Sequence, residues 1–326
     1  MMCYNNHRLK RKELRAVTPI IFDSSDGQDL RINMISPWLK KRFGYKVVKL
    51  ALDGGFTCPN RDGSKGTGGC LFCSASGSGD MASTTPESQI SLLSTKWPKA
   101  KYIAYFQSHT NTYATVGELR SKFEPVLKHP DVIGIAIATR SDCLPGDVVD
   151  YLAELNEKTF LWVELGLQTI HSETARVMNL CHDLADYDDA VQRLTARRIR
   201  VVTHLILGLP GETRDMMEES VRYICGTSNE GAKIFGLKLH MLNVVKGSGL
   251  CEKMPDYVPF DSIEEYVDLL ISMIEIIPSE ITLHRISGDA PRSTLIAPDW
   301  SYKKRTILNM IHQQMRLRDS WQGKFL

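Results

Sequence analysis

The feature that most constrains the fold of this chain is a regular alternation of strand-like and helix-like segments. Runs rich in apolar and β-branched residues predict strands at 47–52, 102–106, 132–138, 160–165, 201–207 and 235–239. Between them, apolar residues recur three and four positions apart, which predicts helices at 86–97, 117–127, 145–157, 187–198 and 213–224. Continuous apolar strands with intervening helices indicate a parallel sheet covered by helices. The chain is therefore expected to be an α/β protein.

The same pattern leaves two α/β architectures open. Six strands in sequence fit a partial (β/α)6 TIM-type barrel, and they also fit a doubly wound open sheet, because periodicity does not separate the two. After the sixth strand we expect a helix at 262–276, a short strand near 281–284 and a terminal helix at 303–318. We expect this last part to form a C-terminal extension that packs on the main sheet.

Composition narrows the class of protein. Hydrophobic residues make up 43% of the 326 residues and charged residues 24%, which is ordinary for a soluble globular protein. No apolar run approaches the roughly 20 residues that span a bilayer, so no membrane contact is expected. The start of the chain is polar and basic, without the apolar segment of a secretory signal, so we expect a cytoplasmic protein. The basic stretch at 8–15 is either a solvated tail or a contact with nucleic acid.

A glycine-rich loop with three cysteines follows the first predicted strand. Cys58, Cys70 and Cys73 lie within sixteen residues, with eleven and two residues between them. In α/β folds, ligands bind at the carboxyl ends of the strands, where this loop begins. Cysteines crowded in this way in a reducing compartment favour metal or redox chemistry over disulfides.

The number of cysteines bears on which metal they bind. A structural zinc site needs four protein ligands, and this loop supplies three. Zinc would therefore need a distant fourth ligand, such as His109 or Cys143. A [4Fe–4S] cluster with one open iron instead suits a small bidentate ligand, which the amino and carboxylate groups of S-adenosylmethionine supply. We favour the cluster.

Several longer motifs accompany the loop. They are TRSD at 139–142, WVELGLQT at 162–169, HLILGLPGET at 204–213 and DSWQGK at 319–324. With the cysteine loop, they resemble the YhcC-like radical S-adenosylmethionine proteins, which are relatives of the Elongator catalytic subunit. The likeness runs from about Trp38 to Lys324. Cys181 stands where that group usually has glycine, and Ser141 where proline is usual.

The resemblance implies a partial barrel over 36–240, with a basic N-terminal extension at 1–35 and the C-terminal extension at 241–326. It also implies an enzyme in which an external electron donor, such as flavodoxin or ferredoxin, reduces the cluster. Cleavage of S-adenosylmethionine then gives a 5′-deoxyadenosyl radical, which takes hydrogen from the substrate. One branch of the group is queuine lyase, which cleaves the free base queuine to 7-aminomethyl-7-deazaguanine. We take this small molecule as the first substrate hypothesis, with modification of transfer RNA or a non-catalytic metal-binding module as alternatives.

The resemblance also gives roles to residues near the predicted strand ends. Gln107 is expected to contact the methionyl amino group of the cofactor, Glu164 and Gln168 its ribose, and Gly208 its adenine. Arg140 is expected to pair with a carboxylate of cofactor or substrate. For Glu164 and Arg140 the alternative is a buried polar group that neighbouring groups satisfy. The residues expected to contact substrate, from their position alone, are His204, His240, Asn243, Arg285, Asp289 and Arg292.

Overall fold

The structure is a computed structural model that describes residues 22–23, 29–74, 76–77, 79–226, 234–288 and 290–326. The basic stretch at 8–15 and Asp289 lie outside the described residues. In the part that is described, no helix is long and apolar enough to cross a membrane.

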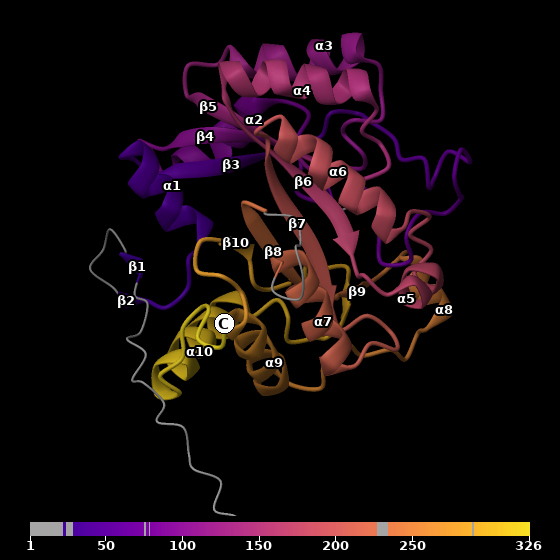
Figure 1. Ribbon diagram of the computed structural model, residues 1–326, viewed down its shortest axis with the longest axis vertical. Coiled ribbons are helices and arrows are strands. Elements are labelled where there is room, and N and C mark those ends of the chain that lie inside the picture. The colour runs from indigo at the N-terminus through magenta and orange to yellow at the C-terminus, as the bar shows by residue number, and fades with distance from the viewer. Residues whose placement is uncertain (1–21, 24–28, 75, 78, 227–233, 289) are drawn as a thin grey trace, which may run out of the picture.

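The centre of the molecule is one parallel sheet (Figure 1). Within the described residues it has seven strands, in the spatial order β10-β8-β7-β6-β5-β4-β3. Their bounds are β3 Val47–Leu52, β4 Lys101–Phe106, β5 Val132–Thr139, β6 Phe160–Gln168, β7 Arg200–Leu207, β8 Gly236–Met241 and β10 Thr282–Arg285. All six strand pairings are parallel.

This strand order decides between the two predicted architectures. A doubly wound sheet reverses its order at a switch point, whereas here each strand lies beside the previous strand of the sheet. The fold is therefore a partial TIM-type barrel. The segment predicted as a short strand of the extension is instead the seventh strand of the barrel, because β10 pairs with β8.

Helices cover the outer face of the sheet (Figure 1). The predicted helices are α2 Pro86–Ser94, α3 Val116–Leu127, α4 Gly146–Lys158, α6 Leu184–Ala196, α7 Arg214–Cys225, α9 Ile263–Glu275 and α10 Lys304–Leu317. Helices α3 and α6 each begin with a capping box, Thr115 with Glu118 and Asp183 with Asp186. The described residues also contain three helices that were not predicted: α1 Ile35–Phe43, α5 Ser172–Val177 and α8 Gly249–Lys253.

Helix α1 packs against both edge strands, β3 and β10. Its buried side chains Ile35 and Leu39 belong to a core cluster with Trp162 of β6 and Val202 of β7. Successive strand residues point to opposite faces of a sheet. Since Trp162 faces this inner cluster, Glu164, Gly166 and Gln168 lie on the same inner face, progressively nearer the carboxyl edge.

The C-terminal part is joined closely to the barrel. One hydrophobic core contains Leu207 and Leu237 of the barrel together with Tyr266 and Ile307 of the extension. The predicted boundary at 240 falls within β8, one residue before its end. Small antiparallel pairs, β1 Phe22–Asp23 with β2 Asp29–Leu30 and β9 Val244–Val245 with β11 Leu295–Ala297, lie outside the main sheet.

Candidate active site

The cysteine loop leaves the carboxyl end of β3 and folds into consecutive turns. The amide of Arg61 donates to the carbonyl of Cys58 at 2.8 Å, and the amide of Cys73 donates to the carbonyl of Cys70 at 2.9 Å. Gly68 and Gly69 have φ angles of 79° and 78°, a left-handed conformation that favours glycine. These two glycines therefore let the chain turn tightly just before Cys70.

All three cysteines line one cavity of about 260 Å³. The neighbouring Cys73 thiol and burial raise the pKa of Cys70 well above its usual range, while Arg140 opposes that shift. Among the described residues, no group of three His, Cys, Asp or Glu side chains is arranged around a single metal ion. In an iron–sulfur cube each thiolate binds a different iron, so the three sulfurs need not converge on one point.

A turn after α5 holds the loop from one side. The amide of Leu71 donates to the carbonyl of Met178 at 3.0 Å. The side-chain amide of Asn179 donates to the carbonyl of Gly69 at 2.8 Å, and that of Asn60 donates to the carbonyl of Asn179 at 2.5 Å. Gly69 and Leu71 are the two sequence neighbours of Cys70, so their bonds fix the position of Cys70 relative to the end of α5.

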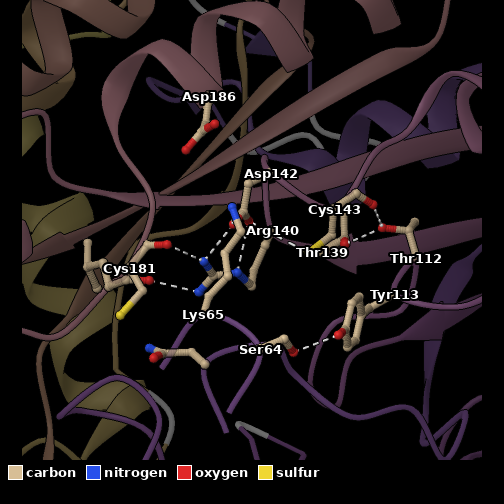
Figure 2. Close-up of polar contacts among 12 residues, drawn as sticks. Ser64, Lys65, Thr112, Tyr113, Thr139, Arg140, Asp142, Cys143, Cys181 and Asp186 are labelled. Carbon is tan, nitrogen blue, oxygen red and sulfur yellow. Dashed lines mark hydrogen bonds and ion pairs between the residues drawn. The ribbon is translucent and has the colours of Figure 1, made fainter. Parts of the chain in front are cut away.

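Arg140 follows β5 directly and is only 8% exposed. Its Nε and Nη2 donate to the two carboxylate oxygens of Asp142, each at 2.9 Å. Nη1 donates to the carbonyl of Leu180 at 2.8 Å and Nη2 to that of Cys181 at 2.9 Å. Lys65, from the cysteine loop, binds the same carboxylate of Asp142 at 2.8 Å. Figure 2 shows Arg140 at the centre of these contacts.

Glu164 lies inside the barrel and is fully buried. Its carboxylate accepts hydrogen bonds from Trp162 Nε1 and His204 Nε2, both at 2.9 Å, and from the ammonium of Lys238. The ammonium of Lys49 lies 3.7 Å from Oε1. Burial acts to raise the pKa of Glu164, but Lys238 and Lys49 outweigh it, so the pKa lies well below its usual range and the carboxylate is ionised.

These contacts bear on the role expected of Glu164. The sequence placed Glu164 and Gln168 at the end of the fourth strand; β6 does end at Gln168, and Glu164 lies four residues before that end. A carboxylate offers about four acceptor positions, and Trp162, His204, Lys238 and Lys49 surround them. Glu164 therefore accepts three hydrogen bonds and one longer ion-pair contact from these neighbours, and it also lines the cavity, so the ribose contact expected from the resemblance stays a prediction.

Most of the other predicted site residues share the cavity with the cysteines. Those that line it are Gln107, Arg140, Glu164, Gln168, His204, His240, Asn243 and Arg285. Burial lowers the pKa of His204 to about 4 and that of His240 well below its usual range, so both rings are neutral near pH 7. His240 Nε2 is buried and has no hydrogen-bond partner among the described residues.

Two predicted contacts lie elsewhere. Gly208 is not among the residues that line the cavity; a Cβ there would come within 2.7 Å of the Phe260 ring, so packing within the chain explains this glycine. Arg292 is exposed and stacks on the ring of Tyr302, 4.5 Å from its centroid, so it does not reach the cavity.

Sequence reasoning missed Lys49 and Lys238, the two cations that face Glu164. Each interrupts an apolar strand, β3 and β8 respectively. That is the same signal that identified Glu164, so the three charged residues could have been expected to face one another inside the barrel. Lys238 is 1% exposed and also donates to the hydroxyl of Tyr105 at 2.9 Å.

A partial barrel with a three-cysteine loop at the carboxyl end of its first strand defines a class of cofactor-dependent α/β enzymes. The model of the Radical SAM superfamily matches residues 61–224, and that of the Radical_SAM C-terminal domain matches residues 234–316. The chain is 48% identical to the uncharacterized protein YtqA of Bacillus subtilis, over 90% of this chain and 92% of that protein. It is 38% identical to protein YhcC of Escherichia coli K12, over 84% of this chain and 89% of that protein.

The chain therefore belongs to the radical SAM superfamily and is an enzyme. A solved structure, that of the archaeal Methanocaldococcus infernus Elp3 with an N-terminal deletion, has the same fold, with a TM-score of 0.62 at 17% identity. That likeness covers 85% of this chain and 64% of the other.

The cofactors of this superfamily are a [4Fe–4S] cluster and S-adenosylmethionine, and the residues present fit them. Three thiols line one cavity, and so do His109, His182 and His240, each of which has one buried ring nitrogen with no hydrogen-bond partner among the described residues. A buried polar atom usually has a hydrogen-bond partner, so a polar ligand in this cavity could supply the partners that these nitrogens lack within the described residues.

Proposed function

We propose that Cys58, Cys70 and Cys73 hold a [4Fe–4S] cluster, and that the enzyme removes hydrogen from a small molecule bound inside the barrel. The observation that carries this proposal is the shared cavity. It is lined on one side by the cysteine loop and on the other by residues of β7, β8 and the segments that follow them. A cofactor on the loop and a substrate at the late strands would therefore meet in one cavity.

The chain's own residues bind and orient the cofactor and shield the reacting carbon from water. When bound, the cluster supplies an electron and S-adenosylmethionine supplies the 5′-deoxyadenosyl group that takes hydrogen from substrate. Gln107 and Gln168, at the ends of β4 and β6, offer amide donors and acceptors to the polar parts of the cofactor. The apolar residues Ala138, Ile206 and Leu242 also line the cavity and would keep water from the reacting carbon.

For the substrate, we propose the free base queuine, which would be cleaved to 7-aminomethyl-7-deazaguanine. The edge of such a base carries both donors and acceptors. Neutral His240, Asn243 and Arg285 line the late-strand side of the cavity and supply groups of both kinds. An external flavodoxin or ferredoxin would deliver the electron.

A second candidate is the modification of transfer RNA. The chain is 25% identical, over 56% of its length, to the tRNA uridine(34) acetyltransferase of Methanocaldococcus jannaschii. It spans only 32% of that relative, so most of the relative has no counterpart here. The matching part alone does not establish an RNA substrate.

The test is turnover by anaerobically reconstituted protein given dithionite and S-adenosylmethionine. Free queuine, queuosine nucleoside and queuosine-containing transfer RNA are supplied separately, and 7-aminomethyl-7-deazaguanine and 5′-deoxyadenosine are followed together. We expect both products from free queuine, in equal amounts if the cofactor is consumed. His240→Ala should lose coupled turnover, while Arg292→Ala, outside the cavity, should retain it. Turnover on transfer RNA alone would support the second candidate, and cofactor cleavage without any base product would reject queuine.

A further inference from the structure

Arg140 separates two cavities in the structure. It lines the cavity of the cysteines, together with Cys58 and Cys70. Its partners Asp142 and Lys65 line a second cavity, of about 980 Å³, whose lining does not include Arg140. The guanidinium therefore faces the proposed cluster site, and the carboxylate that binds it lies behind it.

The hydrogen bonds of Arg140 leave it little capacity for a ligand. An arginine has five N–H donors. Four of them are used within the described part of the chain, two by Asp142 and one each by the carbonyls of Leu180 and Cys181. A bidentate ion pair between Arg140 and the carboxylate of the cofactor would require at least one of these hydrogen bonds to break. The role expected from the resemblance therefore does not suit Arg140 as it is placed here.

The same bonds join three separate segments. Arg140 belongs to the end of β5, Lys65 to the cysteine loop, and Leu180 and Cys181 to the turn after α5 (Figure 2). That turn also binds Gly69 and Leu71, on either side of Cys70. Cys181 has a φ angle of 54°, and a Cβ on Gly66 would lie 2.9 Å from its Sγ, so the turn and the loop are in close contact.

We propose that Arg140 is a positioning residue for the cysteine loop and supplies a fixed positive charge beside the cluster, with Asp142 partly offsetting that charge. This inference rests on the proposed cluster ligands. Reduction adds one negative charge to a cluster. A nearby fixed cation therefore favours the reduced state, and a nearby fixed anion disfavours it. Arg140 lies on the cavity wall and Asp142 behind it, so the cation is the nearer of the two charges.

The experiment is a potentiometric titration of the reconstituted full chain, with the reduced cluster followed by electron paramagnetic resonance. Arg140→Gln should lower the reduction potential, and Asp142→Asn should raise it. We expect each to change the ratio of reduced to oxidised cluster by about tenfold at fixed potential, which corresponds to about 59 mV for one electron. Arg176→Gln removes a surface cation whose side chain is 74% exposed, and should leave the potential unchanged.

Opposite signs distinguish this role from general damage, because loosening of the loop would move both variants in the same direction. The positioning role has its own readout in metal-free protein. The amides of Gly69 and Leu71 should exchange hydrogen about tenfold faster in Arg140→Gln than in wild type, and at the wild-type rate in Arg176→Gln.

Unchanged potentials and exchange rates in both Arg140→Gln and Asp142→Asn would overturn the inference, and so would shifts of the same sign. If Arg140→Gln holds no cluster, the reduction potentials of Asp142→Asn and Lys65→Gln test the inference instead. Asp142→Asn should raise the potential and Lys65→Gln should lower it. Loss of cofactor affinity in Arg140→Gln at an unchanged potential would instead assign Arg140 to the cofactor. Failure of the wild type to form any cluster would reject the proposed function, not this inference alone.

Discussion

At the scale of single residues, the interior of the barrel holds its charges in close contact with one another. Glu164 and Lys238 are 0% and 1% exposed and bind each other directly. Burial lowers the pKa of Lys238, and Glu164 opposes that shift. Removing one member of such a pair leaves an uncompensated buried charge, whereas an exposed ion pair contributes little.

The first prediction at this scale concerns Glu164→Gln. It should lower the free energy of unfolding by about 3–5 kcal/mol, because Lys238 and Lys49 lose their counter-ion. Urea unfolding at pH 7 measures the change. The matched control is Glu173→Gln, which breaks an ion pair whose carboxylate is 72% exposed and should leave the midpoint unchanged. Equal midpoints for the two variants would contradict the buried pair.

At the scale of elements, β10 extends the barrel by a strand that the sequence pattern had placed in the C-terminal extension. Thr282 pairs with Gly236 of β8. His284 packs edge-on against Trp162 and Phe235, with centroids 5.5 Å and 5.6 Å apart. A Cβ on Gly236 would lie 2.5 Å from His284 Nε2 and 2.8 Å from Thr282 Oγ1. The close approach of the two strands therefore depends on a glycine.

Gly236→Ala tests this pairing. The added methyl group should displace His284 and lower the free energy of unfolding by about 1–3 kcal/mol. Gly117→Ala, in helix α3, is the control, because a Cβ there meets no atom within 4 Å. That control should raise stability by about 0.5–1 kcal/mol, because alanine favours a helix more than glycine does. A neutral or stabilising Gly236→Ala would show that β10 does not lie against β8 in this way.

The elements also show what sequence reasoning can and cannot reach. The strands and long helices were predicted because they are periodic and apolar. Helix α1 was missed because its sequence, ISPWLKKRF, buries only Ile35 and Leu39 and ends in three basic residues and a phenylalanine. The partnership of Glu164 with Lys238 was missed because 74 positions separate them, and because they lie on β6 and β8, which are not neighbouring strands.

At the scale of the whole molecule, the barrel brings distant parts of the chain to one edge. The cysteine loop follows β3, at one edge of the sheet, while Asn243 and Arg285 follow β8 and end β10, at the other. The position of the loop at the carboxyl end of the first strand was predictable from the sequence. Which of the predicted site residues line the cavity was not predictable, because Gly208 and Arg292 meet other parts of the chain.

The central claim is that Cys58, Cys70 and Cys73 hold the cluster, and iron content tests it most directly. Anaerobically reconstituted wild-type protein should bind about four irons per chain and, with dithionite, cleave S-adenosylmethionine to 5′-deoxyadenosine. Each single replacement of these cysteines by alanine should lose both iron and cleavage. Cys225→Ala, in helix α7, should keep both. Iron content and cleavage retained in all three single variants, or a colourless protein that binds zinc in place of iron, would contradict the account.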